Sequence, residues 1–324
     1  MNRRTRRALL VAPLLAACSP RTSASPAGGG QIPDTAFVAS LTVVPVVAGP
    51  EHPTVTIDQA HHNFHTASGR FRAFAQLVQR GGFQVREGRS PFDAASLAGT
   101  RILVISNALD ARQTPASAWT LPAISAFTQD EIAAVSAWVR GGGSLLLIAD
   151  HMPFAGAASD LAAALGVRWA NGFAIPPSAA DGKTGDFLIT FRRSDGGLTD
   201  NPISDGASAA DRVDSVTTFT GSAFWIDPER EPTVLLRLPA ATRILLPQRA
   251  WQFTESTRVV SGADVAQGAA FPFGKGKVAV FGEAAMFSAQ LKGPDRVPMG
   301  MNNPIAAENP RFILNLVRWL ASSR

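Results

Sequence analysis

The segment "GGGSLLLIAD", residues 141–150, decides the fold class of this chain. Its three glycines end one element, and the six residues that follow, 144–149, are apolar except for the first. A continuous apolar run of this length is typical of a parallel strand buried on both faces, because a half-exposed strand alternates apolar and polar residues. We therefore predict a buried strand over 144–149, with Asp150 at its carboxyl end.

The elements before this strand repeat the same pattern. The run "RILVIS" (101–106) predicts another buried strand, and Thr128 to Glu131 form a capping box that opens a helix ended by the glycines. Upstream, "TVTI" (54–57) is followed by a helical pattern over 71–80. Strand–helix–strand repeats give a parallel sheet with helices on both faces. The expected fold class is therefore α/β, with a mostly parallel sheet.

Two later regions complete this prediction. Residues 170–270 carry short strand-like runs separated by turn signals, without long helices, and we read them as a β-rich insertion that adds antiparallel or mixed strands to the sheet. The run "VAVFG" (278–282) predicts another buried strand. The segment after Asn309-Pro310 predicts a C-terminal helix.

The amino-terminal residues have the layout of an export signal. Residues 1–17 combine four arginines with a short apolar run, and Leu15-Ala16-Ala17-Cys18 resembles a bacterial lipobox. We predict a signal peptide over 1–17, a lipid on Cys18, a flexible tether over 18–50 and an α/β domain over 51–324. An ordinary secretory signal is the alternative. Thr5 to Leu10 also resembles a twin-arginine motif, so the export route stays open.

The composition of the chain indicates which classes of partner and which cellular compartment to expect. The formal net charge of +5 falls to about +1 once the four signal arginines are removed, and no basic stripe interleaved with aromatics is present. We therefore expect no nucleic-acid partner. The expected partners are a membrane, reached through the lipid, and a small polar ligand or envelope component. The predicted location is the periplasmic face of a bacterial membrane, with the outer membrane favoured by Ser19.

Four of the five histidines follow predicted parallel strands. Because the carboxyl ends of parallel strands meet at one edge of the sheet, the polar residues after each strand should converge there. The predicted catalytic residues are His62, Asp58, Asp150, His151 and Glu283. The predicted ligand-binding residues are His61, Asn63, His65, Asn107 and Asn302.

These residue types are compatible with two kinds of chemistry. Imidazole and carboxylate groups bind zinc and similar ions, so a divalent metal held by His61, His65 or His151 is one possibility. The same groups can perform acid–base chemistry without a metal, and no cofactor is required by the sequence. A third reading gives Asp58 and Asp150 purely structural roles as loop and helix caps.

Four motifs in order resemble a known family: "IDQAHHNFHT", "GGGSLLLIADHMP", "VFGEAAMFSAQ" and "MGMNNPIAAENPRFILNLVRWL". They are similar to a bacterial domain family of unknown function related to the class I glutamine amidotransferase-like superfamily. The same broad group includes the amino-terminal region of an intraflagellar transport subunit. The resemblance implies a flavodoxin-like three-layer sandwich.

The chain departs from the amidotransferases of that superfamily at their nucleophile. They use a cysteine at a strand-to-helix elbow, whereas Asp150-His151 follow the comparable strand and Cys18 is the only cysteine. Glutamine hydrolysis by a thiolate is therefore excluded. The leading prediction is an exported protein that binds or hydrolyses a small polar ligand, such as a sugar or cell-envelope fragment. The alternatives are a non-catalytic scaffold and a metal-dependent hydrolase.

Overall fold

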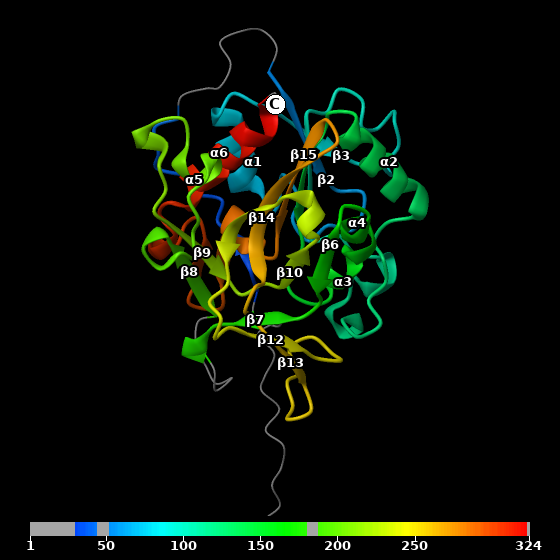
Figure 1. Ribbon diagram of the computed structural model, residues 1–324, viewed down its shortest axis with the longest axis vertical. Helices are drawn as coiled ribbons and strands as arrows, with labels where there is room; N and C mark the ends of the chain where they lie inside the picture. The colour runs from blue at the N-terminus through cyan, green and yellow to red at the C-terminus, as the bar shows by residue number, and fades with distance from the viewer. Residues whose placement is uncertain (1–29, 44–51, 180–186, 323–324) are drawn as a thin grey trace, which may run out of the picture.

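A large mixed sheet forms the centre of the computed structural model, which describes residues 30–43, 52–179 and 187–322 (Figure 1). The strand order is β3-β2-β4-β5-β15-β14-β10-β6, with β11 paired to β14. The first five strands are mutually parallel: β3 (Gln84–Gly88), β2 (Thr54–Asp58), β4 (Ile102–Ser106), β5 (Ser144–Ile148) and β15 (Gly276–Phe281). The other four are antiparallel to their neighbours: β14 (Ala266–Phe273), β10 (Ala223–Ile226), β6 (Val167–Ala170) and β11 (Thr233–Arg237). The predicted α/β class with a large sheet is confirmed.

Helices cover both faces of this sheet, which explains why its central strands are apolar throughout. Ile102 and Val104 of β4 belong to the core on one side, and Leu103 and Ile105 belong to the core on the other. The first core is covered by α1 (Arg72–Arg80) and α6 (Asn309–Ala321). The second is covered by α2 (Gln129–Arg140), α3 (Phe154–Ala157) and α4 (Ser159–Ala164). Alternate side chains of one strand therefore enter different cores.

Helix α2 begins where the sequence predicted. Thr128 accepts a hydrogen bond from the backbone amide of Glu131, and the Glu131 side chain accepts one from the amide of Thr128. This confirms the predicted capping box. Ile132, Val135 and Val139 form the buried face of the helix.

The β-rich insertion only partly extends the large sheet. Strands β7 (Phe173–Ile175), β12 (Arg243–Leu246) and β13 (Arg258–Ser261) form a separate sheet, and β8 (Leu188–Arg192) pairs only with β9 (Ser215–Phe219). The predicted extension of the large sheet is therefore confirmed for β11 and wrong for β8 and β9. The reason is that the apolar face of β8–β9, with Ile189, Phe191 and Val216, packs into the core beside α6.

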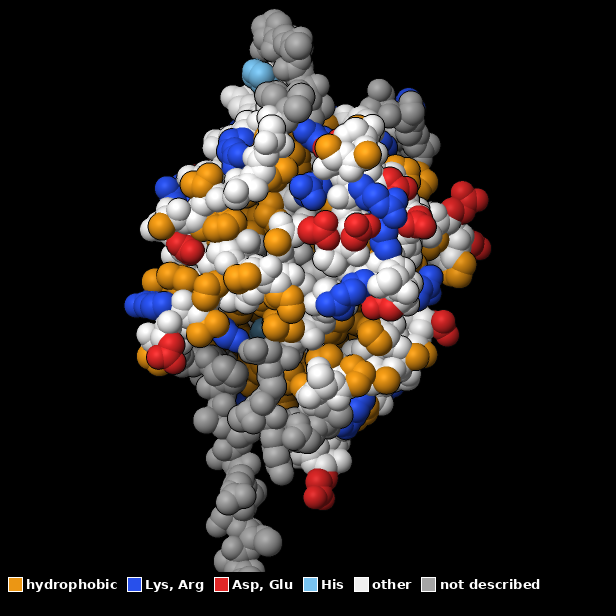
Figure 2. Space-filling view, turned by 90° about the vertical axis from the view of Figure 1, so that its left-hand side faces the viewer, with side chains coloured by type: hydrophobic (Ala, Val, Ile, Leu, Met, Phe, Trp, Pro, Cys, Tyr) orange, Lys and Arg blue, Asp and Glu red, His pale blue; other side chains and the backbone are white. Residues whose placement is uncertain are grey.

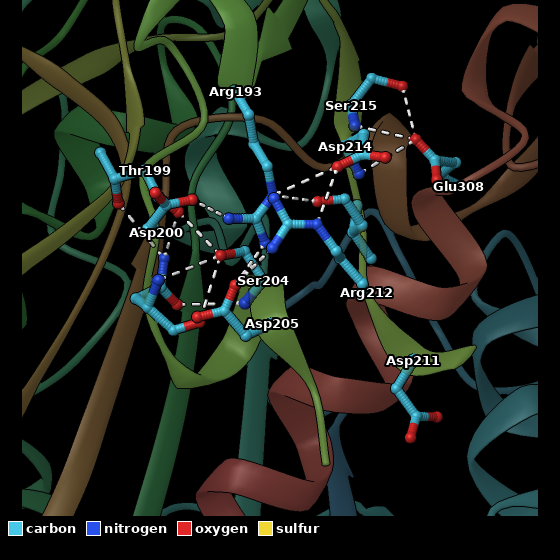
Figure 3. Close-up of polar contacts among 12 residues, drawn as sticks. Arg193, Thr199, Asp200, Ser204, Asp205, Asp211, Arg212, Asp214, Ser215 and Glu308 are labelled. Carbon is cyan, nitrogen blue, oxygen red and sulfur yellow. Dashed lines mark hydrogen bonds and ion pairs between the residues drawn. The ribbon is translucent and has the colours of Figure 1, made fainter. Parts of the chain in front are cut away.

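An arginine inside the insertion joins three of its segments (Figure 3). Arg193 is only 9% exposed and forms ion pairs with Asp200, Asp205 and Asp214. Asp205 is the last residue of the short helix α5 (Pro202–Asp205). Arg193 therefore ties α5 and the approach to β9 to the end of β8.

Residues 30–43, which we call the strap, lie against the domain. Strand β1 (Ile32–Pro33) pairs with β16 (Ala289–Lys292), which in turn pairs with β17 (Val297–Gly300). Arginines in and beside α1 donate to strap carbonyls: Arg70 to Gln31, Arg72 to Thr35, and Arg80 to Ala39 and Leu41.

This part of the predicted tether (18–50) therefore makes specific contacts with the domain. The sequence did not indicate them, because backbone carbonyls accept from arginine whatever the side chains are. The predicted signal peptide (1–17) and Cys18 lie outside the described residues.

Charged side chains of both signs are mixed on the face of the molecule that Figure 2 draws. Lys and Arg stand among Asp and Glu and among patches of hydrophobic side chains, without gathering into one basic area. The expected absence of a nucleic-acid partner stays a prediction. None of the described helices combines the length and the hydrophobicity needed to cross a bilayer.

Candidate functional site

The strands β2, β4, β5 and β15 lie side by side, so the residues after them share one edge of the sheet. We call it the carboxyl edge. It carries Asp58 at the end of β2, Asn107 after β4, Asp150 after β5 and Glu283 after β15. The structure thus brings together polar residues that lie more than 200 positions apart in the sequence.

At one end of this edge, His61 lies between two carboxylates. Its Nδ1 is 2.9 Å from Oδ2 of Asp58, and its Nε2 is 2.8 Å from Oε1 of Glu131. We call Asp58, His61 and Glu131 the triad. An ionised carboxylate only accepts hydrogen bonds, so both ring nitrogens must carry hydrogen and the imidazole is a cation. The triad is therefore a buried, charge-assisted cluster.

The pKa values of His61 and Glu131 agree with that charge state. Burial lowers the pKa of His61, but hydrogen bonds and charge from Asp58 and Glu131 outweigh it, and the net result is a raised pKa. Burial raises the pKa of Glu131, but the amide of Thr128, His61 and the amide of Phe92 lower it to about 2. The imidazolium form of His61 and the carboxylate form of Glu131 therefore stabilise each other.

The residues around His61 shield its side chain from solvent. The rings of Phe92 and Phe127 lie 4.5 Å and 4.8 Å from its own, and the side chain is 7% exposed. Asn63 donates to Asp58 and to the carbonyl of Ser106, and accepts from the His61 amide. Both residues thus use their polar atoms inside the protein, and they hold the loop after β2 against the end of β4.

The other two histidines of this loop have different surroundings. His65 is fully buried against Phe71, and burial, followed by the charge of Arg70, lowers its pKa to about 3. His62 is exposed, in the left-handed region at φ 46°. Neither lies with Asp58 in the triad. Among the predicted metal candidates, His61 has both ring nitrogens occupied and His65 is a neutral core residue.

At the centre of the carboxyl edge, two carboxyl residues follow neighbouring strands, since Asp150 and Glu283 each come two positions after the paired residues Ile148 and Phe281. Asp150 and Glu283, which we call the carboxylate pair, interact electrostatically. Glu283 is 1% exposed and accepts from the amides of Ala285 (2.7 Å) and Met286 (2.8 Å). Burial raises the pKa of Glu283 well above its ordinary value, and the charge of Asp150 raises it further. This is the environment of a carboxyl group that can hold a proton at neutral pH.

Asn107 lies beside the carboxylate pair and has an unused donor. It is 1% exposed, and its Oδ1 accepts from the amide of Asp150 at 2.8 Å. Its Nδ2 is buried and finds no hydrogen-bond acceptor among the described residues. Buried polar groups are nearly always satisfied in native proteins, so this donor lacks an acceptor that another molecule could supply.

His151 lies next to Asp150 and is surrounded by aromatic rings. Its Nδ1 donates to the carbonyl of Met152 at 2.7 Å, so this ring nitrogen carries a hydrogen. Within the described residues, its Nε2 makes no hydrogen bond. The surrounding rings belong to Phe173 (4.7 Å, parallel), Trp251 (4.7 Å), Phe154 (5.8 Å) and Trp119 (6.1 Å). His151 therefore keeps one ring nitrogen without a hydrogen bond among the described residues. We call the four surrounding rings the aromatic wall.

Strained backbone gathers around the same residues. Asn107, Thr220 and Trp251 have φ values of 47°, 121° and 65°, which are unusual for residues other than glycine. After Thr220, Gly221 approaches so closely that a Cβ there would lie 2.3 Å from the carbonyl oxygen of Gly282 and 2.8 Å from Cβ of Glu283. Such strain is concentrated at functional sites more often than elsewhere.

Asn302 contacts the strap. Its amide nitrogen donates to Asp34 of the strap and to the carbonyl of Gln290. The amide nitrogen of Asn302 is thus used inside the protein. In the described part of the chain, no group of three or more His, Cys, Asp or Glu side chains is arranged to hold a metal ion.

Sequence reasoning missed Glu131, Trp119 and Trp251 at this edge. Glu131 was explained by its capping box, which hid its second role as the partner of His61. Trp251 comes from the insertion, and no spacing in the sequence places it beside His151. The contact of Glu131 with His61 could have been suggested by one signal, a carboxylate at the amino end of a helix that follows a histidine-rich loop.

The pH dependence of stability follows from the triad. The raised pKa of His61 means that its contribution is complete below pH 6.5 and is lost as the pH rises through the raised value. We expect the free energy of unfolding to fall above pH 6.5, and to fall less steeply in Glu131→Gln, where one carboxylate is neutral. Urea unfolding at several alkaline pH values measures both slopes, and equal slopes would contradict an imidazolium in the triad. His65, whose pKa is lowered, makes the free energy of unfolding fall as the pH drops below 6.5. The effect of His61 is therefore measured above pH 6.5, where His65 does not contribute.

Comparisons with known proteins concern the fold. No family model and no curated protein matches the chain by sequence. The solved structure described as "mmIFT52 N-terminal domain" is similar with a TM-score of 0.53 and 14% identity, over 83% of this chain and 98% of that one. A thua-like protein from Bacteroides uniformis ATCC 8492 gives a TM-score of 0.47 at 12% identity, over 85% and 94%. Cytoplasmic Protein STM1381 from Salmonella typhimurium LT2 gives 0.48 at 14%, over 83% and 100%. At such identities a likeness shows the fold alone.

Proposed function

We propose that this chain is an exported, lipid-anchored protein that binds a small polar ligand, such as a sugar or cell-envelope fragment, at the carboxyl edge. The observation that carries the proposal is the buried, unpaired Nδ2 of Asn107 beside the carboxylate pair. In open α/β sheets, ligands bind at the carboxyl ends of the strands, where these residues lie. The fold would be a flavodoxin-like three-layer sandwich of the glutamine amidotransferase-like superfamily, and the likeness to the first solved structure supports this.

The same residues are suited to hydrolysis. Glu283, with its raised pKa, could donate a proton to a leaving group, while the free Nε2 of His151 could take one from an attacking water. Such a division of roles needs two titratable groups whose environments push their pKa values apart. Cys18 is the only cysteine in the sequence, so this proposal involves no thiolate.

The pocket is tested by Asn107→Asp. Aspartate keeps the oxygen that accepts from Asp150 and tolerates the left-handed backbone, but it replaces the unpaired donor with an acceptor near two carboxylates. We expect at least one of a panel of sugars and soluble envelope fragments to raise the melting temperature of the wild type. The variant should lose roughly 1–3 kcal/mol of that binding.

The matched control is Asn201→Asp. Asn201 caps α5 by accepting from Ile203 and Ser204, and aspartate keeps both bonds. Aspartate loses the bonds from Nδ2 to Thr199, as Asn107→Asp loses its own donor, so stability should fall while ligand binding should not change. If every compound that stabilises the wild type also stabilises Asn107→Asp to the same extent, the ligand does not bind at the carboxyl edge.

The anchor has its own test. In Cys18→Ser the thioether that would carry the lipid cannot form, so a protein labelled with radioactive fatty acid in cells should lose its label completely. The folded domain should be unaffected, as judged by its melting temperature. Undiminished labelling of Cys18→Ser would refute the lipid anchor.

A further inference from the structure

The carboxylate pair has no cationic partner in the described part of the chain. Among the described residues, neither Asp150 nor Glu283 forms an ion pair with a lysine, arginine or histidine, although Glu283 is almost fully buried. Without a cation beside it, buried Glu283 is held in its protonated form, because an isolated charge in a poorly solvated place is costly. A positive group supplied by a ligand would complete this site.

An acidic pair alone does not define a ligand, but Asn107 adds an independent observation. Its side-chain amide is 1% exposed and is fixed beside Asp150 by the bond from Oδ1. Its unpaired Nδ2 can only donate, so it requires an oxygen acceptor on the ligand. The two features together describe a molecule with a cation and an oxygen close to each other.

The aromatic wall indicates which kind of cation fits. Asp150 accepts from the amide of His151, whose ring contacts Phe173 and Trp251. Trp251 is half-buried on a strained loop, and its indole N–H makes no hydrogen bond within the described residues. Aromatic faces attract organic cations, above all alkylated ammonium groups, whereas strongly hydrated inorganic ions prefer oxygen ligands.

We infer that the carboxyl edge recognises an alkylammonium ion that carries an oxygen acceptor, with its positive group between the carboxylate pair and Trp251 and its oxygen on Asn107. The inference rests on the proposed pocket and names the class of its ligand. Electrostatic attraction to the carboxylates and cation–π attraction to the ring act on the same positive group. Removing either should therefore weaken binding without unfolding the protein.

Choline is a direct probe, because a neutral isostere exists in which carbon replaces its nitrogen. Calorimetric titration of the wild type should show saturable binding of choline, with the isostere weaker by roughly tenfold or more. Asp150→Asn and Trp251→Leu should each lose roughly tenfold, and Trp251→Phe should keep most of the affinity. Trp225→Leu is the matched control, since Trp225 is a half-buried tryptophan of β10 that contacts Arg168 instead.

The outcomes separate the two proposals. If the isostere binds as tightly as choline, or if choline does not bind while another compound binds in an Asn107-dependent way, the ammonium class is wrong and the pocket stands. If Trp251→Leu and Trp225→Leu behave alike, the aromatic wall has no part in recognition and the inference fails. If neither choline nor any other compound depends on Asn107, the pocket itself is refuted.

Discussion

Replacing His61 by alanine is expected to lower the free energy of unfolding by about 3–5 kcal/mol. The change removes the cation between Asp58 and Glu131 and leaves two buried carboxylates without their common partner. It also removes the ring that Phe92 and Phe127 enclose, which adds the cost of a cavity. Urea unfolding at pH 6 to 7, followed by fluorescence, measures the loss.

Two further variants show whether charge is the cause. His52→Ala should change stability by less than about 0.5 kcal/mol, because His52 is exposed and, among the described residues, its hydrogen bond is with the carbonyl of Gly82. Adding Asp58→Asn to His61→Ala should recover part of the loss, since it removes one unpaired charge. If the double variant is less stable than His61→Ala by the full effect of Asp58→Asn alone, the two residues do not interact and the triad is not a charged cluster.

Replacing Arg193 by methionine is expected to cost about 2 kcal/mol. The guanidinium group is nearly buried and donates to Asp205 (2.7 Å) and to the carbonyl of Val213 (2.7 Å), with Asp200 and Asp214 also paired to it (Figure 3). These aspartates are 46–79% exposed, so water screens much of each ion pair. Most of the loss should come from the hydrogen bond to the carbonyl of buried Val213, and it should appear in thermal unfolding.

Arg212→Met is the matched control for this prediction. Arg212 contacts two of the same aspartates, Asp205 at 3.5 Å and Asp214 at 3.2 Å, but it is 50% exposed. Its loss should be within about 0.5 kcal/mol. Equal losses in the two variants would mean that the buried position of Arg193 adds nothing to the stability of the insertion.

The parallel half of the fold could be predicted because its signals are local. The run at 144–149 is apolar because both faces of β5 are buried, and the capping box at Thr128 fixes the start of α2 within one turn. The insertion could not be predicted in the same way. Whether β8 joins the large sheet or pairs only with β9 depends on where its apolar face finds a partner, which is a property of distant residues.

The candidate site shows the same division. The sequence placed Asp150 and Glu283 at one edge because strand direction alone determines it. The hydrogen bond between His61 and Glu131 could not be predicted from the sequence, because it joins a loop to a helix 70 positions later. Trp251 was missed for the same reason. The edge was thus predictable from topology, whereas the partner of each side chain depends on tertiary packing.

The strap has a mechanical consequence if Cys18 carries a lipid. Because arginines hold the chain from Gln31 onward, the linker between the anchor and the first of these contacts comprises at most residues 18–30. A chain of that length reaches about 40 Å when fully extended. The domain would then stay within roughly its own diameter of the bilayer. Its pocket would then meet molecules close to the membrane surface and not those in the rest of the compartment. A longer linker, with the pocket unchanged, should increase the distance from the membrane at which the pocket can bind.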